Sequence, residues 1–307
     1  CIRNNAGRTG KQSRSTNWLS LEIILVRLVF AERLLYVAPT SPLGSPMLEF
    51  FDTLTLLLTA AAFIAGIIDS IAGGGGMITI PALLIAGIPP VEALGTNKLQ
   101  GLFGSSSATI AYARKGHVNI KQQWPEALAS LIGSVFGALL ATVLPVDIMR
   151  AALPILLIAI AIYFAIKPSL GDVDRSRRIG PFLFGITLVP LIGFYDGLFG
   201  PGTGSFFMLA FVALAGFGVL KATAHTKLLN CASNIGGFAT FAAVGVINWK
   251  IGICMGIAQF IGAQIGASLA MKIGSRIIKP LLIVVSLALA VRLLMDGTNP
   301  LRQWIGF

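Results

Sequence analysis

Long apolar runs, separated by short polar or glycine-containing breaks, fill the chain from residue 47 onward. A run of about 20 apolar residues, at a rise of about 1.5 Å per residue, crosses the hydrocarbon core of a bilayer. The pattern predicts ten apolar segments: 51–72, 77–88, 97–113, 124–144, 149–167, 180–199, 204–218, 223–245, 251–271 and 278–295. The second and seventh are short and follow glycine clusters, so each is either a re-entrant half-helix or a short helix covered by its neighbours.

The two halves of this apolar pattern repeat each other. An offset of 127 residues places Asp69 on Asp196, and an offset of 129 places Lys98 on Lys227. The same offsets also place Gly75 on Gly202, Gly133 on Gly262 and Gly137 on Gly266. An apolar duplication interrupted by glycine at matching places is typical of secondary transporters. We therefore expect an all-α polytopic membrane protein with two homologous transmembrane repeats, eight spans plus the two short segments.

This pattern divides the chain into four regions. We expect a basic extension over residues 1–46, a first repeat over 47–170, a cytoplasmic linker over 171–179 and a second repeat over 180–307. The extension differs from the rest because its first part is polar and basic and its apolar part is too short to cross a bilayer. Our interpretation is that Met47 is the natural start and that the extension is disordered or not native. The alternative is a basic arm on the membrane surface.

Composition supports the membrane assignment and excludes one class of partner. The 307 residues are 55% hydrophobic and 11% charged, whereas a soluble domain has roughly 25% charged residues. The net charge of +11 does not indicate nucleic-acid binding, because the basic residues lie in short loops, where they set membrane orientation.

The relative orientation of the two halves depends on the two short segments. If all ten segments cross the membrane, the two halves are inverted; if the short segments are re-entrant, the halves are parallel. The loop charges favour the inverted arrangement only slightly, so both remain open.

The two glycine clusters are the first candidate for a binding site. Glycine allows the backbone to approach a ligand closely, and each cluster precedes a short helix whose N–H groups and dipole attract anions. We expect the substrate-binding backbone to comprise Gly73, Gly74, Gly75 and Gly76 with Gly200, Gly202, Thr203 and Gly204. The alternative is close helix packing, which we favour for the scattered glycines at 133, 137, 262 and 266.

Two lysines with neighbouring polar residues are the second candidate. Lys98 and Lys227 stand at the start of apolar runs, next to Asn97, Thr226 and Asn230. An ammonium group with hydroxyl and amide donors supplies the charge and the directional hydrogen bonds that an oxyanion needs. We therefore expect these five residues to bind an anionic substrate. The alternative is that the lysines extend to the interface and contact lipid phosphates.

Three further ionisable residues are candidates for coupling or gating. Asp69 and Asp196 lie near the ends of apolar segments, where a carboxylate is costly unless it has a function or a partner. Each carries a coupling proton, caps the next helix, or pairs with Lys98 or Lys227, and these interpretations remain open. His225 occurs in one half only, and a packing role is the alternative to proton relay.

No signature of catalysis or of a cofactor is present in the sequence. The chain has two histidines and lacks a P-loop, a nucleotide fingerprint, metal-ligand spacing and a serine–histidine–acid set. Its three cysteines, Cys1, Cys231 and Cys254, have no paired spacing, and we expect apolar packing for them. We expect no enzyme activity, no cofactor and no metal.

Four motifs in order resemble the TauE/SafE sulfite exporter family, also labelled DUF81, and in detail its YfcA-type members. They are Asp-Ser-Ile-Ala-Gly-Gly-Gly-Gly at 69–76, Ala-Leu-Gly-Thr-Asn-Lys-Leu-Gln at 93–100, Gly-Phe-Tyr-Asp-Gly-Leu-Phe-Gly-Pro-Gly-Thr-Gly at 193–204 and Lys-Ala-Thr-Ala-His-Thr-Lys-Leu-Leu-Asn at 221–230. The resemblance covers about residues 47–295. It implies a permease of the bacterial inner membrane, with about eight spans, for sulfite or an organosulfonate.

Residue chemistry and resemblance together predict a secondary transporter for a small anion, with the lipid bilayer and the substrate as its partners. A passive anion channel and a non-transport membrane assembly factor are the alternatives. The sequence leaves open the substrate, the direction of transport, the coupling ion and the oligomeric state.

Overall fold

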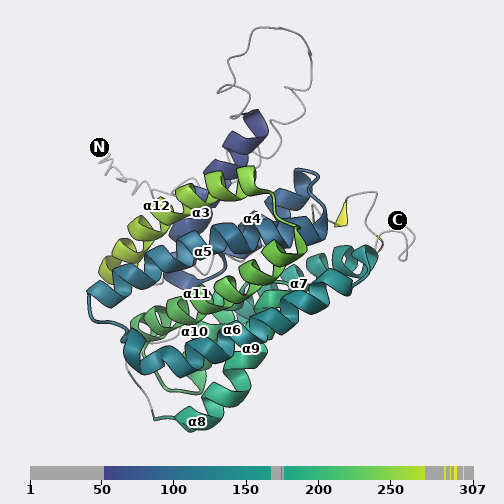
Figure 1. Ribbon diagram of the computed structural model, residues 1–307. Helices are drawn as coiled ribbons and strands as arrows, with labels where there is room; N and C mark the ends of the chain where they lie inside the picture. Colours follow the sequence, from purple (N-terminus) through teal and green to yellow (C-terminus); the bar gives the residue numbers. More distant parts are fainter. Residues whose placement is uncertain are drawn as a thin grey trace, which may run out of the picture. The chain divides into compact units, whose positions relative to one another are not determined.

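The computed structural model describes residues 52–166, 174, 176–273 and isolated positions beyond them. The predicted extension over 1–46 and nearly all of the tenth apolar segment, 278–295, lie outside the described residues. The described residues from 52 onward belong to one compact unit, and all of their regular secondary structure is helical (Figure 1).

Nine of the predicted apolar segments correspond to helices. The first five are α3 (Thr53–Ala72), α4 (Gly75–Ile85), α5 (Pro90–Arg114), α6 (Ile120–Val143) and α7 (Val146–Ile166). The sixth is one continuous helix made of α8 (Pro181–Leu183), the π-helical turn η2 (Phe184–Leu188) and α9 (Val189–Leu198). The last three are α10 (Thr203–Ala213), α11 (Val219–Val244) and α12 (Trp249–Ile273). Within the described residues, four helices are long and apolar enough to cross a membrane: α3, α6, the α8–α9 helix and α12. The expected short segments are the 11-residue helices α4 and α10.

Local chemistry explains where these helices begin and end. The side chain of Asp52 caps α3 by accepting a hydrogen bond from Thr55 N at 2.6 Å, and Asn119 caps α6 by accepting one from Lys121 N at 3.0 Å. Pro90 occupies the first position of α5, where its missing N–H costs nothing. Gly245 ends α11 in the left-handed conformation, with φ of 80°.

The long helices pack closely through small residues. A Cβ atom at any of four glycines would overlap a backbone carbonyl of the facing helix: Gly133 faces Pro190, Gly137 faces Phe194, Gly262 faces Phe63 and Gly266 faces Ile67. The first two contacts join α6 to α9 and the last two join α12 to α3, so each lies between a helix of the first half and one of the second. The four glycines therefore serve helix packing, which governs association in lipid because apolar burial supplies no driving force there.

Helices α5 and α11 run antiparallel (Figure 1). Near the start of α5, the hydroxyl of Thr96 accepts a hydrogen bond from Asn248 N, just beyond the end of α11, at 3.0 Å. Near the start of α11, the carbonyl of His225 accepts one at 3.5 Å from Gln123, which closely follows the end of α5. These contacts hold α5 and α11 side by side in opposite directions.

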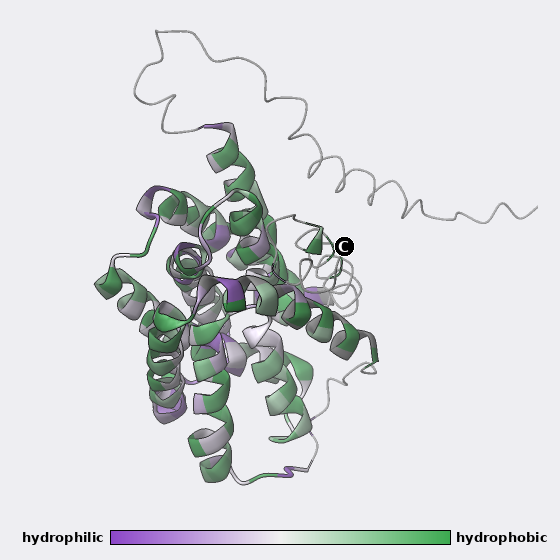
Figure 2. Cartoon of the chain, turned by 90° about the vertical axis from the view of Figure 1, so that its right-hand side faces the viewer, coloured by the Kyte–Doolittle hydropathy of each residue, from purple (hydrophilic) through white to green (hydrophobic). Residues whose placement is uncertain are grey.

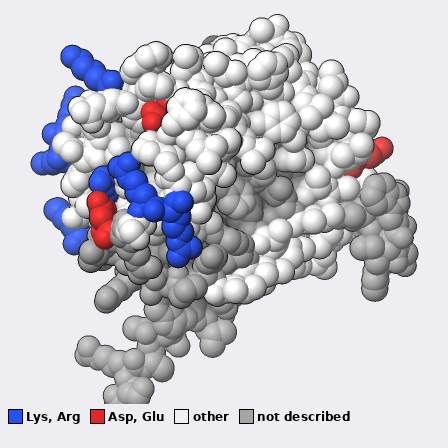
Figure 3. All heavy atoms as spheres, turned by 90° about the horizontal axis from the view of Figure 1, so that it is seen from below, with Lys and Arg blue, Asp and Glu red and all other residues white. Residues whose placement is uncertain are grey.

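The outer surface suits a bilayer. The helices are hydrophobic along most of their length (Figure 2), and large apolar side chains such as Phe136 and Val143 are 61% and 74% exposed. Exposed basic residues occur where α5 ends and α6, α8 and α11 begin: Arg114, Lys115, Lys121, Arg177, Arg178 and Lys221. Figure 3 shows that Lys and Arg gather on this face of the molecule.

The described part of the linker docks on the loop between α10 and α11. Asp174 accepts hydrogen bonds from Gly218 N at 2.6 Å and from Lys221 Nζ at 2.9 Å, while Arg178 N donates to the Leu214 carbonyl at 2.9 Å. The Gly218 N–H and then the Lys221 ammonium lower the pKa of Asp174 from its ordinary value. These contacts hold the start of the second half next to α11.

Candidate functional site

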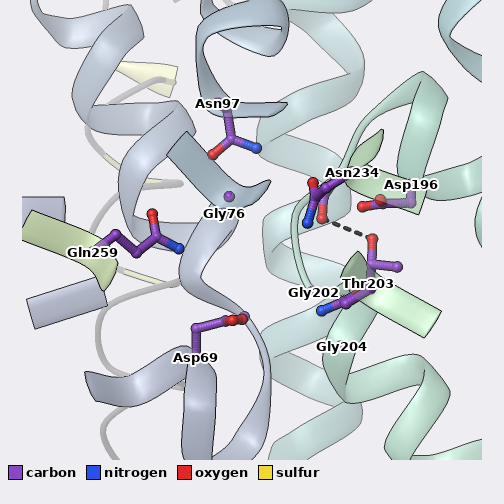
Figure 4. A pocket seen from close by; sticks show the side chains of 13 residues that line it. Asp69, Gly76, Asn97, Asp196, Gly202, Thr203, Gly204, Asn234 and Gln259 are labelled. Carbon is purple, nitrogen blue, oxygen red and sulfur yellow. Dashed lines mark hydrogen bonds between the residues drawn. The ribbon is translucent and has the colours of Figure 1, made fainter. Parts of the chain in front are cut away.

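A small polar cavity lies where the two glycine clusters meet (Figure 4). Its walls are formed by Asp69, Gly74, Gly76, Asn97, Gly101, Asp196, Gly200, Gly202, Thr203, Gly204, Asn230, Asn234 and Gln259. Its volume is about 30 Å³, and one water molecule needs roughly 10–15 Å³ by this measure. The cavity therefore has room for about two water molecules, which is less than a sulfonate group with its organic substituent occupies.

Two short helices begin at this cavity. Gly74 precedes α4 and Gly202 precedes α10, both in the left-handed conformation with φ of 104° and 79°, and neither helix has a side-chain cap from that residue. The backbones of Gly73 and Gly204 are in such close contact that neither position has room for a Cβ atom. Glycine is required here both for the backbone conformation and for the contact. The positive ends of two helix dipoles thus converge on one place.

Two buried ion pairs connect the halves of the chain. Lys98 Nζ on α5 lies 2.8 Å from Asp196 Oδ2 on α9, and Lys227 Nζ on α11 lies 3.1 Å from Asp69 Oδ2 on α3. Both lysine side chains are 0% exposed. Each carboxylate therefore pairs with the lysine of the other half, and the two pairs together carry no net charge.

The lysines occupy a different place from the one expected from the sequence. They lie well inside α5 and α11, which begin at Pro90 and Val219, and not at helix starts. The preceding polar residues are helical because they are buried with partners; for example, Thr96 accepts the hydrogen bond from Asn248 N. Complete burial is also incompatible with lysines that extend to the lipid interface.

Asp69 has two roles at once, capping and pairing. Its Oδ1 accepts a hydrogen bond at 3.1 Å from Gly75 N, the first residue of α4. Its Oδ2 accepts one from Lys227, and Lys227 also donates to the Asp69 backbone carbonyl. This carboxylate therefore connects the end of α3, the start of α4 and the middle of α11.

Four carboxamide side chains complete the cavity. Asn97 Oδ1 accepts hydrogen bonds from Thr79 Oγ1 at 2.7 Å and Gln100 Nε2 at 3.1 Å, so its nitrogen is the atom turned toward the cavity (Figure 4). Asn230, Asn234 and Gln259 line the other walls. Carboxamides and backbone N–H groups supply directional donors without a net charge.

The structure brings most of the predicted site residues together, but not all. Ten line the cavity: Asp69, Gly74, Gly76, Asn97, Asp196, Gly200, Gly202, Thr203, Gly204 and Asn230. Lys98 and Lys227 lie behind the aspartates, Gly73 and Gly75 form the helix junctions, and Thr226 Oγ1 is buried without a hydrogen-bond partner in the described part of the chain. His225 lies away from the cavity, with its ring 4.9 Å from that of Phe217 and 5.6 Å from that of Phe211.

Sequence reasoning missed three lining residues: Gly101, Asn234 and Gln259. The signal for Gln259 is that it is one of two amides in an apolar helix, Gln259 and Gln264, because an amide is costly in lipid without a partner or function. Across residues 52–166 and 176–273, no three His, Cys, Asp or Glu side chains gather to form a metal site.

Comparison of the amino-acid sequence with known proteins identifies its family. The family model described as sulfite exporter TauE/SafE matches residues 58–293. A probable membrane transporter protein, ORF9, of Sinorhizobium sp is 67% identical over 82% of this chain and 97% of its own length. The probable membrane transporter protein YfcA of Escherichia coli K12 is 45% identical over 81% of this chain and 93% of its own length. No solved structure matches the chain.

Proposed function

The chain belongs to the TauE/SafE sulfite exporter family, and on that premise we propose that it is a secondary transporter that moves a small anion, sulfite or an organosulfonate, through the cavity between α4 and α10. The observation that carries this proposal is the convergence of two helix N-termini on a buried cavity lined by carboxamides. An oxyanion needs hydrogen-bond donors and positive potential, and helix N-termini supply both. A buried lysine adds charge that becomes accessible when its carboxylate partner is protonated or moves.

We propose further that the two halves are inverted repeats with the cavity near the bilayer midplane. The antiparallel course of α5 and α11 supports this arrangement, as do the matched contacts of α3 with α12 and of α9 with α6. Inverted repeats that enclose a site between broken helices are the usual architecture of secondary transporters. On this proposal α4 and α10 are short buried helices, and eight longer spans surround them.

The exposed basic residues give the orientation. Because Lys and Arg accumulate in cytoplasmic loops, the part of the surface where they gather, at the left of Figure 3, is the cytoplasmic one in this proposal. Bacterial relatives named as membrane transporters support the bacterial inner membrane as its location.

The size of the cavity indicates how transport takes place. A space of about 30 Å³ accommodates no organosulfonate, so the halves must separate to admit the substrate from either side. A permanent anion channel needs a continuous passage, and this small cavity does not favour one. The driving force is then a substrate or ion gradient.

Uptake of [³⁵S]sulfite and [³⁵S]sulfoacetate into proteoliposomes tests the proposal. The informative variant is Asn230→Leu, which replaces a cavity carboxamide by an apolar side chain of similar size. Loss of one hydrogen bond to a charged group is worth about 1.5–3 kcal/mol, so the half-saturation concentration should rise roughly 10- to 150-fold.

The matched control is Val244→Ala, on the same helix but 50% exposed on the outer surface. It should transport like the wild type. Saturable uptake with unchanged half-saturation in Asn230→Leu would place the substrate elsewhere, and no uptake of either anion would refute the proposed function.

A further inference from the structure

The two buried ion pairs occupy matching positions, but their surroundings differ. Asp69 is held by the Gly75 N–H and by Lys227, which also binds its backbone carbonyl. In the described part of the chain, Asp196 has Lys98 as its partner and accepts no hydrogen bond from the start of α10 that corresponds to the Asp69–Gly75 bond. The first pair therefore makes two hydrogen bonds with backbone atoms, the Gly75 N–H and the Asp69 carbonyl. The second pair makes no corresponding hydrogen bonds in the described part of the chain.

Lys98 also has unused donor capacity. An ammonium group has three N–H donors, yet Nζ of Lys98, which lies 2.8 Å from Asp196 Oδ2, makes no hydrogen bond of regular geometry with any residue that the structure describes. Its stem packs against Gly237, and a Cβ atom at Gly200 would lie 3.5 Å from Nζ. Since Gly200 and Asp196 both line the cavity, the ammonium lies directly behind the cavity wall and has donors to spare for a ligand.

The helix that carries Asp196 is also the more adaptable one. It contains the π-helical turn η2 and has Pro190 in the turn that follows, whereas α3 is a regular α-helix through all 20 residues. A π-helical turn and a proline both interrupt the regular hydrogen-bond ladder, and such turns often occur at functional positions. Asp196 can therefore move relative to Lys98 more readily than Asp69 can move relative to Lys227.

We propose that Lys98–Asp196 is the exchangeable pair of the transporter and that Lys227–Asp69 is a fixed structural tie. This inference rests on the proposed anion transport. A proton from the water on one side binds the Asp196 carboxylate, and the substrate oxyanion takes its place beside the Lys98 ammonium. Departure of the anion and the proton to the other side restores the ion pair. No covalent bond to the substrate forms, and each anion moves with a single proton.

The groups around Asp196 are compatible with this cycle. Among the residues that the structure describes, the charged or titratable side chains near it are Lys98 on α5, Tyr195 on α9, and Asp69 with Lys227 across the cavity. Because Lys227 neutralises Asp69, Lys98 dominates the field at Asp196. The neighbouring residues of α6 and α10, Ser134 and Thr203, do not titrate, and Glu126 on α6 lies farther along, beside Gly185.

Two matched double variants separate the roles. Lys98→Gln/Asp196→Asn and Lys227→Gln/Asp69→Asn each remove one pair without leaving an unpaired charge. Each is reconstituted in proteoliposomes at equal amounts of folded protein, and [³⁵S]sulfoacetate accumulation and luminal pH are followed under an imposed pH gradient. Sulfoacetate is chosen because its charge is constant near neutral pH.

We expect the first double variant to lose proton movement with sulfoacetate and its half-saturation concentration to rise roughly 10- to 150-fold, since a charge-assisted contact is gone. The second should keep the wild-type ratio of protons to sulfoacetate, at a reduced rate and with a lower melting temperature. The single variant Asp196→Asn, which imitates the protonated carboxyl, should still bind sulfoacetate but transport it without protons.

Three outcomes overturn the inference. Proton coupling that survives in the Lys98/Asp196 double variant, or that is lost equally in both double variants, removes the distinction between the pairs. Proton-coupled transport by Asp196→Asn excludes this carboxylate as the proton carrier. In these cases the wild type still transports sulfoacetate and only the inference fails, whereas a wild type that carries neither sulfoacetate nor sulfite refutes the proposed function with it.

Discussion

Substitution of Gly137 by alanine tests the helix packing that encloses the site. A Cβ atom at this position would overlap the carbonyl oxygen of Phe194, and the nearest atoms are backbone rather than flexible side chain. Helices α6 and α9 must therefore move apart. Overpacking in a close contact costs about 1–3 kcal/mol, and in a chain of this size about 1 kcal/mol shifts the melting temperature by roughly 2–4 °C. We expect the melting temperature of the detergent-solubilised protein to fall by about 2–12 °C.

Two further variants are measured beside Gly137→Ala, one with a similar overlap and one as a control. Gly266→Ala makes the corresponding overlap with the Ile67 carbonyl between α12 and α3 and should destabilise to a similar degree. Gly185→Ala is the control, because its Cβ atom meets only the side chain of Glu126, at 3.5 Å. If all three variants have the same melting temperature as the wild type, the close packing of these helices does not contribute to stability.

Further predictions concern single contacts. Tyr112→Phe removes the hydrogen bond of 2.9 Å to the Ser70 carbonyl beside Asp69 and should cost about 1 kcal/mol in thermal unfolding; an unchanged melting temperature would exclude a contribution from this bond. The lowered pKa of Asp174 means that its contribution to linker docking is present at neutral pH and is lost as pH falls through that lowered value. The protection of Gly218 N from hydrogen exchange, measured relative to its intrinsic rate at each pH, should fall only in strong acid, whereas Asp174→Ala should lower it at neutral pH; equal protection in both proteins would contradict the docking.

The sequence predicts the helices and most of the residues that line the cavity, but it does not predict how the charged residues pair. The apolar runs locate nine helices because burial in lipid requires a continuous hydrophobic length. The repeat offset places Asp69 with Asp196 and Lys98 with Lys227 by position, but it does not say which carboxylate meets which lysine. That choice depends on the antiparallel docking of α5 and α11, which only tertiary structure determines.

Two other features escape sequence reasoning for identifiable reasons. Gln259 corresponds by the 129-residue offset to Ser130, so comparison of the halves gives no signal for it. Hydropathy does not locate the start of α5, because residues 90–97 are too polar for an apolar run, yet most of them are buried among neighbouring helices. Hydropathy shows which segments contact lipid, and it does not reveal polar helices inside the protein.

Counterflow tests the central claim, that an anion binds between the two glycine-capped helices and is carried by alternating access. Proteoliposomes are loaded with unlabelled sulfoacetate and diluted into a trace of [³⁵S]sulfoacetate, with protein-free vesicles as the control. The account predicts that label accumulates transiently above its equilibrium level in wild-type vesicles, and that Asn230→Leu reduces this overshoot. Label that rises only to equilibrium, without saturation, would contradict a carrier and indicate a passive anion pathway.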